Sequence, residues 1–278
     1  MIDSSVKYAE SDLNNLGRDC LDTIQVLLKT FPGSCGATHG LLEKFIFTNL
    51  GRGQGLDSSL ASCLALMPRL GGGGKEGINH KSNFVTFFQR LCYTLQDVLE
   101  QILKLTIGGA NKKINSNGVP RALESFSLTS PSSNCNMLQK AIHFQRQFEA
   151  VGLCLEELLA VPFPHPKSIR PGLLLGILKR SFDQSLQQFS NSANHSHEAK
   201  VLLLISPFIL VSSQNLLKKL LAVCAMSMLP YAHVYMEVIS GVFSDLRHFS
   251  DEPWADLKIS THQLVKLAIN FDYLQTVR

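Results

Sequence analysis

A glycine run at residues 71–74, followed by Lys75, comes nearer than any other part of this chain to a pattern for chemistry. A phosphate-binding loop needs the pattern G-x-x-x-x-G-K-[ST], because its backbone amides hold the phosphates and its hydroxyl binds magnesium. Here Arg69 stands at the first glycine position and Glu76 at the hydroxyl position, and no strand pattern precedes the run. The sequence therefore argues against nucleotide binding and predicts a flexible connector.

Histidines supply the next possible site. His195 and His197 stand two residues apart in a Ser/Asn-rich stretch, and His143, His165 and His233 lie elsewhere in the chain. A stable zinc site needs three or four ligands at fixed spacing. Two histidines in a polar loop are more typical of solvated side chains, so we predict no metal ligand.

Arrangements typical of catalysis are not found in the sequence. There is no G-x-S-x-G elbow and no carboxylate pair in a recognisable context. The seven cysteines are widely spaced, include no C-x-x-C pair and fall mostly at apolar positions, which predicts reduced core thiols. We expect no catalytic residue, no cofactor and no enzymatic activity.

Two L-x-x-L-L strings offer a possible means of binding a protein partner, because a helix can dock its leucine face into a hydrophobic groove. The candidate partner-binding residues are Leu155, Leu158, Leu159, Leu217, Leu220 and Leu221. The alternative is core packing, since exposing each leucine would forfeit roughly 1.5–3 kcal/mol of burial. Solvent accessibility separates the two interpretations: buried leucines cannot dock without local unfolding.

Helical periodicity dominates the elements that would carry these motifs. Apolar residues recur at spacings of four and three from Phe84 to Leu105, which places them along one face of a helix of about six turns. A second stripe from Phe144 to Leu158 repeats the pattern. Each helix is too one-sided to be stable alone in water and must pair. We therefore predict an all-α fold, a HEAT/armadillo-like solenoid of antiparallel helix pairs.

The predicted helices are separated by prolines and by glycine-rich or polar stretches. They are 17–30, 38–50, 56–67, 81–106, 137–160, 170–189, 198–227, 230–248 and 259–275. The helix over 198–227 is expected to kink or split at Pro207 and to be the most buried. A Ser/Asn/Gly-rich segment, 108–136, predicts a disordered insertion between a first helical block, 1–107, and a second, 137–278.

Composition bounds the class of protein. Apolar residues make up 45% of the chain, and the 17% of charged residues falls below the usual quarter, which suggests that some apolar surface meets a partner. The net charge of +4 is small and is not gathered into one stretch of sequence, so direct nucleic-acid binding is not indicated. With no signal peptide and a longest apolar stretch of about half a membrane span, the chain is expected to be soluble and intracellular.

A colinear series of landmarks carries a family resemblance. The series comprises Thr30-Phe-Pro-Gly-Ser-Cys-Gly36, a Leu/Phe-rich segment to Leu50, Leu64-Ala-Leu-Met-Pro-Arg-Leu-Gly-Gly72, the stripe 84–105, the segment 145–159 and the apolar block 202–229. In this order the landmarks resemble the helical-repeat region of the proline-, glutamic acid- and leucine-rich protein family. Members of that family are Rix-type scaffolds of large ribosomal subunit assembly.

This resemblance implies a non-enzymatic scaffold for pre-rRNA processing in the nucleus, in both nucleolus and nucleoplasm. The implied partners are a WD40 propeller subunit, a second helical-repeat subunit, a midasin-type AAA ATPase and the pre-large-subunit particle. The chain lacks the leading repeats and the acidic Pro/Glu-rich tail of the family, which suggests a partial gene product or a short form. A truncated solenoid has an uncapped apolar end, so we also expect poor solubility in isolation.

Two other functions stay open at this point. Animal members of the family are described as nuclear-receptor coregulators, and the L-x-x-L-L helices would then be the binding elements. A generic HEAT-type adaptor, for example in transport, is the third possibility. A full-length sequence without an acidic tail would favour the adaptor.

Overall fold

The computed structural model of this 278-residue chain describes residues 17–52, 55–72, 74–106, 123–190, 197–246 and 257–266. Every regular element in these ranges is helical, and the same ranges contain no strand. The prediction of an all-α fold is therefore confirmed for the described residues. The chain divides into two compact units.

The first unit contains residues 1–98, 111–135 and 146–169. Its helices are α2 (Gly17–Thr30), α3 (His39–Asn49), α4 (Asp57–Leu66), the first part of α5 (Ile78–Thr106) and the second part of α6 (Met137–Ala160). Short 3-10 turns η1 (Gly36–Thr38), η2 (Met67–Arg69) and η3 (Lys75–Gly77) lie between them. Helix α4 packs against both α2 and α3, and its residues from Leu60 to Leu66 are nearly all buried.

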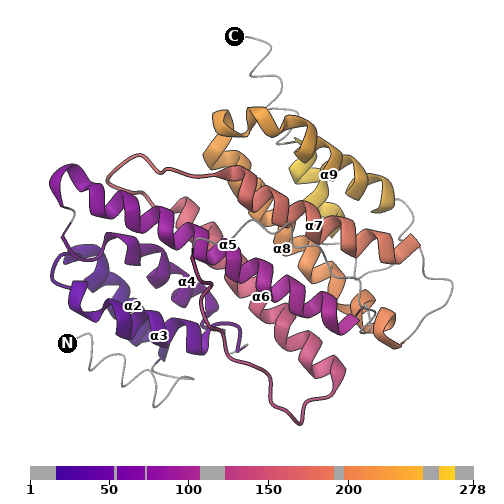
Figure 1. Ribbon diagram of the computed structural model, residues 1–278, viewed down its shortest axis with the longest axis horizontal. Coiled ribbons are helices and arrows are strands. Elements are labelled where there is room, and N and C mark those ends of the chain that lie inside the picture. Colours follow the sequence, from indigo (N-terminus) through magenta and orange to yellow (C-terminus); the bar gives the residue numbers. More distant parts are fainter. Residues whose placement is uncertain are drawn as a thin grey trace. The chain divides into compact units, whose positions relative to one another are not determined.

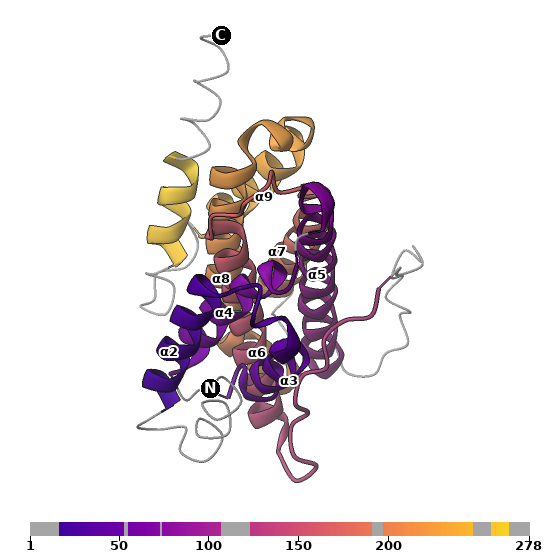
Figure 2. The same cartoon turned by 90° about the vertical axis from the view of Figure 1, so that its left-hand side faces the viewer.

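The second unit contains residues 99–110, 136–145 and 170–278. It includes α7 (Pro171–Ser190), α8 (His197–Met228), the 3-10 turn η4 (Leu229–Tyr231), α9 (Ala232–Leu246) and a helical segment over 257–266. Helix α7 packs against both α8 and α9, and Figure 2 shows α7 and α8 together from a second side. Apolar side chains from Leu174 to Phe182 and from Leu216 to Leu221 form much of this core.

The predicted helices agree closely with those observed. Helices α2, α4 and α6 begin and end within a residue of their predicted bounds. In α5 the predicted apolar stripe is buried from Phe84 to Ile102, while Leu105 is half-buried. The last predicted helix, 259–275, is helical over 257–266, and its remainder lies outside the described residues.

Helix α8 differs from its prediction in two respects. It runs unbroken for 32 residues with Pro207 inside it, so the expected split does not occur. Ser206 donates a hydrogen bond from its hydroxyl to the Leu202 carbonyl, one turn earlier, at 2.7 Å. We also expect α8 to be the most buried helix, but one of its faces exposes large apolar side chains.

The predicted insertion over 108–136 also needs correction where the structure describes it. Residues 107–122 lie outside the described residues, but 123–136 are described and make specific contacts within the first unit. Phe126 is buried there, because removing its large apolar ring from water is favourable even though its neighbours in sequence are polar. The two compact units interleave along the chain, with boundaries within α5 and α6 as well as in this segment, so they do not coincide with the predicted helical blocks.

Candidate interaction surfaces

The L-x-x-L-L leucines are inaccessible in both helices. Leu155, Leu158 and Leu159 of α6 are no more than 1% exposed, and the same holds for Leu217, Leu220 and Leu221 of α8. All six contribute to the cores of their units, as the core-packing interpretation predicts. Docking into a partner's groove would require these helix segments to unfold locally.

Helix α8 instead exposes a different set of apolar side chains. Leu204, Phe208, Val223 and Met226 are 56%, 52%, 40% and 67% exposed. Phe208 and Met226 are separated by 18 residues, or five helical turns, so they lie on the same side of the helix. A row of large exposed apolar side chains is typical of surfaces that bind partners, which makes this face a candidate interaction surface.

The opposite side of α8 is tied into its unit by polar contacts as well as by leucines. The hydroxyls of Ser181 in α7 and Ser213 are 2.8 Å apart. Gln214 donates from Nε2 to Oγ1 of Thr261 at 2.7 Å. These hydrogen bonds offset the cost of burying the two serine hydroxyls and the Gln214 amide nitrogen, while Oε1 of Gln214 is buried without a partner among the described residues.

These contacts bear on a second interpretation of α8. By length and composition alone, residues Lys200–Cys224 could cross a membrane, but 67% of the tested window is buried within the protein. If lipid surrounded α8, Ser213 and Gln214 would lose the hydrogen bonds that they form with Ser181 and Thr261. The observations favour the core helix of a folded unit.

In the first unit, the landmarks at residues 30–36 and 64–72 meet directly. The backbone amide of Gly71 donates to the Pro32 carbonyl at 3.0 Å. A Cβ added to Gly36 would lie 2.9 Å from the Cα of Gly71, so a side chain at Gly36 would force the two backbones apart. Two motifs that are distant in sequence thus form one turn–turn contact, which explains the need for small residues there.

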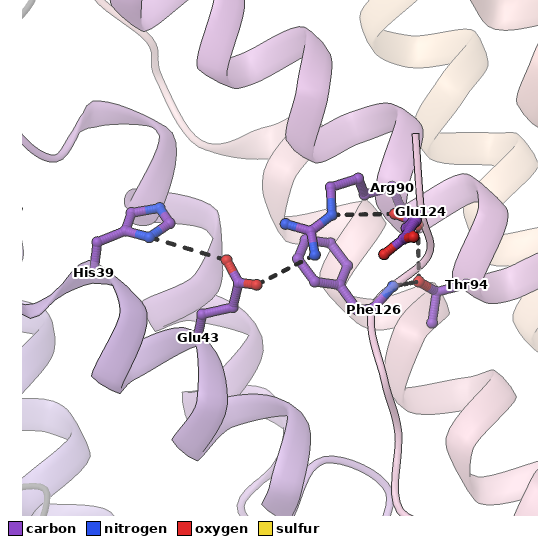
Figure 3. A network of polar contacts seen from close by, with 6 residues as sticks. All are labelled: His39, Glu43, Arg90, Thr94, Glu124 and Phe126. Atoms are coloured by element: carbon purple, nitrogen blue, oxygen red, sulfur yellow. Dashed lines mark hydrogen bonds and ion pairs between the residues drawn. The ribbon is translucent and has the colours of Figure 1, made fainter. Parts of the chain in front are cut away.

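An extended segment of residues 124–129, which we call the strap, lies against α3, α5 and α6 in the first unit (Figure 3). The Phe126 ring stacks on Phe47 with centroids 4.1 Å apart and lies 5.5 Å from Phe87. Its backbone amide donates to Oγ1 of Thr94 at 2.9 Å. At the other end, buried Gln147 donates to the Thr129 carbonyl at 2.7 Å.

Arg90 joins the strap to α3 (Figure 3). Its guanidinium lies 3.7 Å from the centroid of the Phe126 ring, and its Nε donates to the Glu124 carbonyl at 3.2 Å. Nη2 of Arg90 lies 3.3 Å from Oε1 of Glu43, whose other oxygen is 3.9 Å from Nδ1 of His39. Burial is the main cause that lowers the pKa of His39, with a smaller opposing effect from Glu43.

The remaining residues considered for chemistry are not brought together into a reactive cluster by the described part of the chain. His195 lies outside the described residues, and His197 begins α8. Within the described ranges no group of three His, Cys, Asp or Glu side chains is placed to hold a metal ion. All seven cysteines are free: Cys20 and Cys135 are half-buried and the others are buried.

Two curated proteins match nearly the whole chain at low identity, and no protein-family model matches it. Both relatives carry the name of the family that the landmarks resemble, so that resemblance is confirmed. The first is proline-, glutamic acid- and leucine-rich protein 1 of Xenopus laevis, which is 24% identical over 92% of this chain. The second is the protein of the same name in Mus musculus, 20% identical over 90% of this chain.

The matched region is a small part of each relative. It covers 26% of the Xenopus laevis protein and 22% of the Mus musculus protein. The chain therefore spans about a quarter of the length of the curated relatives it matches.

Proposed function

We propose that this chain is part of a non-enzymatic helical scaffold in a nuclear complex that assembles the large ribosomal subunit and processes pre-rRNA. The observation that carries the proposal is the similarity over 92% of the chain to a protein of the proline-, glutamic acid- and leucine-rich family. The exposed apolar face of α8 supports it, since a scaffold acts through surfaces that bind other subunits.

The proposed architecture is a HEAT/armadillo-like array of antiparallel helix pairs. Contacts of α2 with α4 and of α7 with α8 supply candidate pairs, one in each compact unit. In such an array each pair contacts its neighbours and leaves an extended surface for partners. The scaffold would raise the effective concentration of its partners on the precursor particle.

The proposed partners follow from the family resemblance. They are a WD40 propeller subunit, a second helical-repeat subunit, a midasin-type AAA ATPase and the pre-large-subunit particle. The proposed location is the nucleus, in nucleolus and nucleoplasm. Binding through leucine-motif helices, as a nuclear-receptor coregulator would require, is less well supported because those six leucines are buried.

Depletion of the protein that carries this chain tests the proposal in cells. We expect precursors that retain the internal transcribed spacer next to large-subunit rRNA to accumulate, as measured by blotting with a spacer probe. Re-expression of the protein should reverse the accumulation, which controls for off-target effects. Unchanged spacer processing, with normal levels of large subunits, would contradict the proposal.

A further inference from the structure

A serine followed by a proline is the pair that proline-directed protein kinases phosphorylate, and the chain contains two such pairs. They are Ser130-Pro131, in the coil that follows the strap, and Ser206-Pro207, in α8. No threonine in the sequence precedes a proline. Proline makes these sites chemically distinct, because it has no backbone N–H and its ring fixes φ. The fold treats the two pairs very differently.

Ser206 is inaccessible to a kinase. Its side chain is only 1% exposed, in the interior of a helix of 32 residues. Its hydroxyl already donates to the Leu202 carbonyl at 2.7 Å. A kinase must bring the acceptor hydroxyl against the γ-phosphate of ATP. Helix α8 would have to unfold around Ser206 before that could happen.

Ser130 is accessible by the same criteria. Its side chain is exposed, and residues 124–132 have no regular secondary structure. A residue that precedes proline is restricted to extended conformations, which is the shape of a substrate chain in a kinase cleft. The coil that follows the strap projects from the helices of the first unit (Figure 1). Within the described residues no hydrogen bond engages the Ser130 hydroxyl.

Contacts on either side hold Ser130 at the surface. On the N-terminal side, Gln147 donates from Nε2 to the Thr129 carbonyl at 2.7 Å. On the C-terminal side, the backbone amide of Cys135 donates to the Ser132 carbonyl at 3.1 Å and closes a turn. The serine–proline pair therefore lies between an anchored residue and a turn, where a kinase reaches it without unfolding a helix.

The neighbouring residues indicate the class of kinase. No lysine or arginine occurs from residue 122 to residue 139, and Glu124 is the single acidic residue in that range. Kinases that recognise several basic or acidic side chains near the acceptor would find no such set of charges to pair with. The proline after Ser130 is the distinctive feature that remains.

We propose that Ser130 is a phosphorylation site for a proline-directed serine/threonine kinase. The Ser130 Oγ atom attacks the γ-phosphorus of ATP, the bond from that phosphorus to the bridging oxygen breaks, and ADP leaves with the electron pair. The hydroxyl proton passes to the catalytic aspartate of the kinase. The phosphoserine adds a charge of about −1.5 to −2 and three acceptor oxygens beside Thr129. This proposal goes beyond the proposed function and does not depend on it.

Incubation of the 278-residue chain with ATP and an active mitogen-activated protein kinase tests the proposal. A generic substrate in a parallel reaction shows that the kinase is active. Trypsin cuts after Arg121 and Lys140, and fragmentation of the resulting peptide by mass spectrometry distinguishes Ser130 from the other serines in it. We expect a single phosphate per chain, on Ser130.

Three variants of the full chain separate the contributions of serine, proline and fold. Ser130→Ala should abolish the incorporation of phosphate. Pro131→Ala should slow it about tenfold or more, because alanine restores the backbone N–H and the freedom of φ. Ser206→Ala is the matched control: it removes the hydroxyl of the other serine–proline pair and should leave the rate within about twofold of wild type, since no kinase reaches that hydroxyl in the folded chain. Thermal melts verify that each variant is folded.

Phosphate on Ser206, or on a serine without a following proline, at a rate equal to that of Ser130 would overturn the proposal. An undiminished rate for Pro131→Ala would overturn the proline-directed class. Failure to modify the folded chain while the generic substrate is fully modified would show that the exposed pair is not a substrate.

Discussion

The guanidinium of Arg90 in α5 lies 3.7 Å from the centroid of the Phe126 ring in the strap. The ring of Phe47 in α3 stacks on the other face of the Phe126 ring, with the two centroids 4.1 Å apart and an interplanar angle of 14°. A single aromatic side chain thus links two helices through a segment without regular structure of its own.

Phe126→Ala should detach the strap. Replacing a buried phenylalanine by alanine costs about 3–5 kcal/mol of stability, and Phe126 is only 4% exposed. Limited proteolysis should then cut within 124–129 at a protease concentration that leaves the wild-type chain intact. Ser127→Ala, at an exposed neighbouring position, serves as the control and should behave as wild type. Equal protease resistance of the Phe126 variant and wild type would show that the ring does not anchor the strap.

The leucine motif of α8 should behave as core. Leu217→Ala should lower the free energy of unfolding by about 2–5 kcal/mol, as expected for a fully buried leucine. Leu204→Ala makes the same chemical change in the same helix at a side chain that is 56% exposed. We expect its effect to stay within about 0.5 kcal/mol. Chemical denaturation monitored by circular dichroism measures both, and similar values for the two variants would be inconsistent with the burial described.

His39 should make stability fall as the solution becomes mildly acidic. Burial lowers the pKa of His39 below its ordinary value of 6.5, with Glu43 opposing and Arg90 reinforcing the shift. The unfolded chain therefore binds a proton at this residue more readily than the folded chain. The stabilisation is present above about pH 6.5 and is lost as the pH falls through the folded pKa.

Thermal melts at pH 7.5 and pH 6 measure this effect. The melting temperature of wild type should fall more between the two pH values than that of His39→Gln, which cannot titrate there. An identical pH dependence in both proteins would rule out His39 as the group responsible.

Thiol reactivity should divide the cysteines into two classes. Burial, reinforced by the charge of Asp22, raises the pKa of Cys63 to about 12, and burial also raises the pKa of Cys92 and Cys154. The thiolate is the reactive form, so these three should be alkylated slowly in the native state. Mass spectrometry after brief iodoacetamide treatment at pH 8 should find label mainly at half-buried Cys20 and Cys135. Rapid native labelling of Cys92 or Cys154 would contradict the packing of α5 or α6.

Local periodicity made the helices predictable. The stripe from Phe84 to Ile102 depends only on spacing along one helix, and that spacing alone places these side chains on one buried face. The same reasoning identified Leu155 and Leu217 as core, because their motifs continue apolar faces. A split at Pro207 is what local reasoning predicts, because proline is a strong helix breaker, but α8 continues through it.

Contacts between distant segments were not predictable in this way. Phe126 sits in a polar stretch whose composition resembles disorder, and its burial depends on Phe47 and Arg90, which lie far away in the sequence. The contact between the His80 and His165 rings is not predictable for the same reason, since the two side chains meet only in the folded first unit. One signal was available: the alternation of prolines from Pro162 to Pro166 indicates an extended segment held against a surface.

Affinity purification of the tagged chain from nuclear extract, followed by mass spectrometry, tests the scaffold proposal most directly. The account predicts recovery of a WD40 propeller subunit, a second helical-repeat subunit and proteins of the large-subunit precursor. Leu204→Ala and Leu217→Ala variants, purified in parallel, separate loss of a surface from loss of folding. Recovery of nuclear receptors or transport factors without any pre-ribosomal protein would contradict the account.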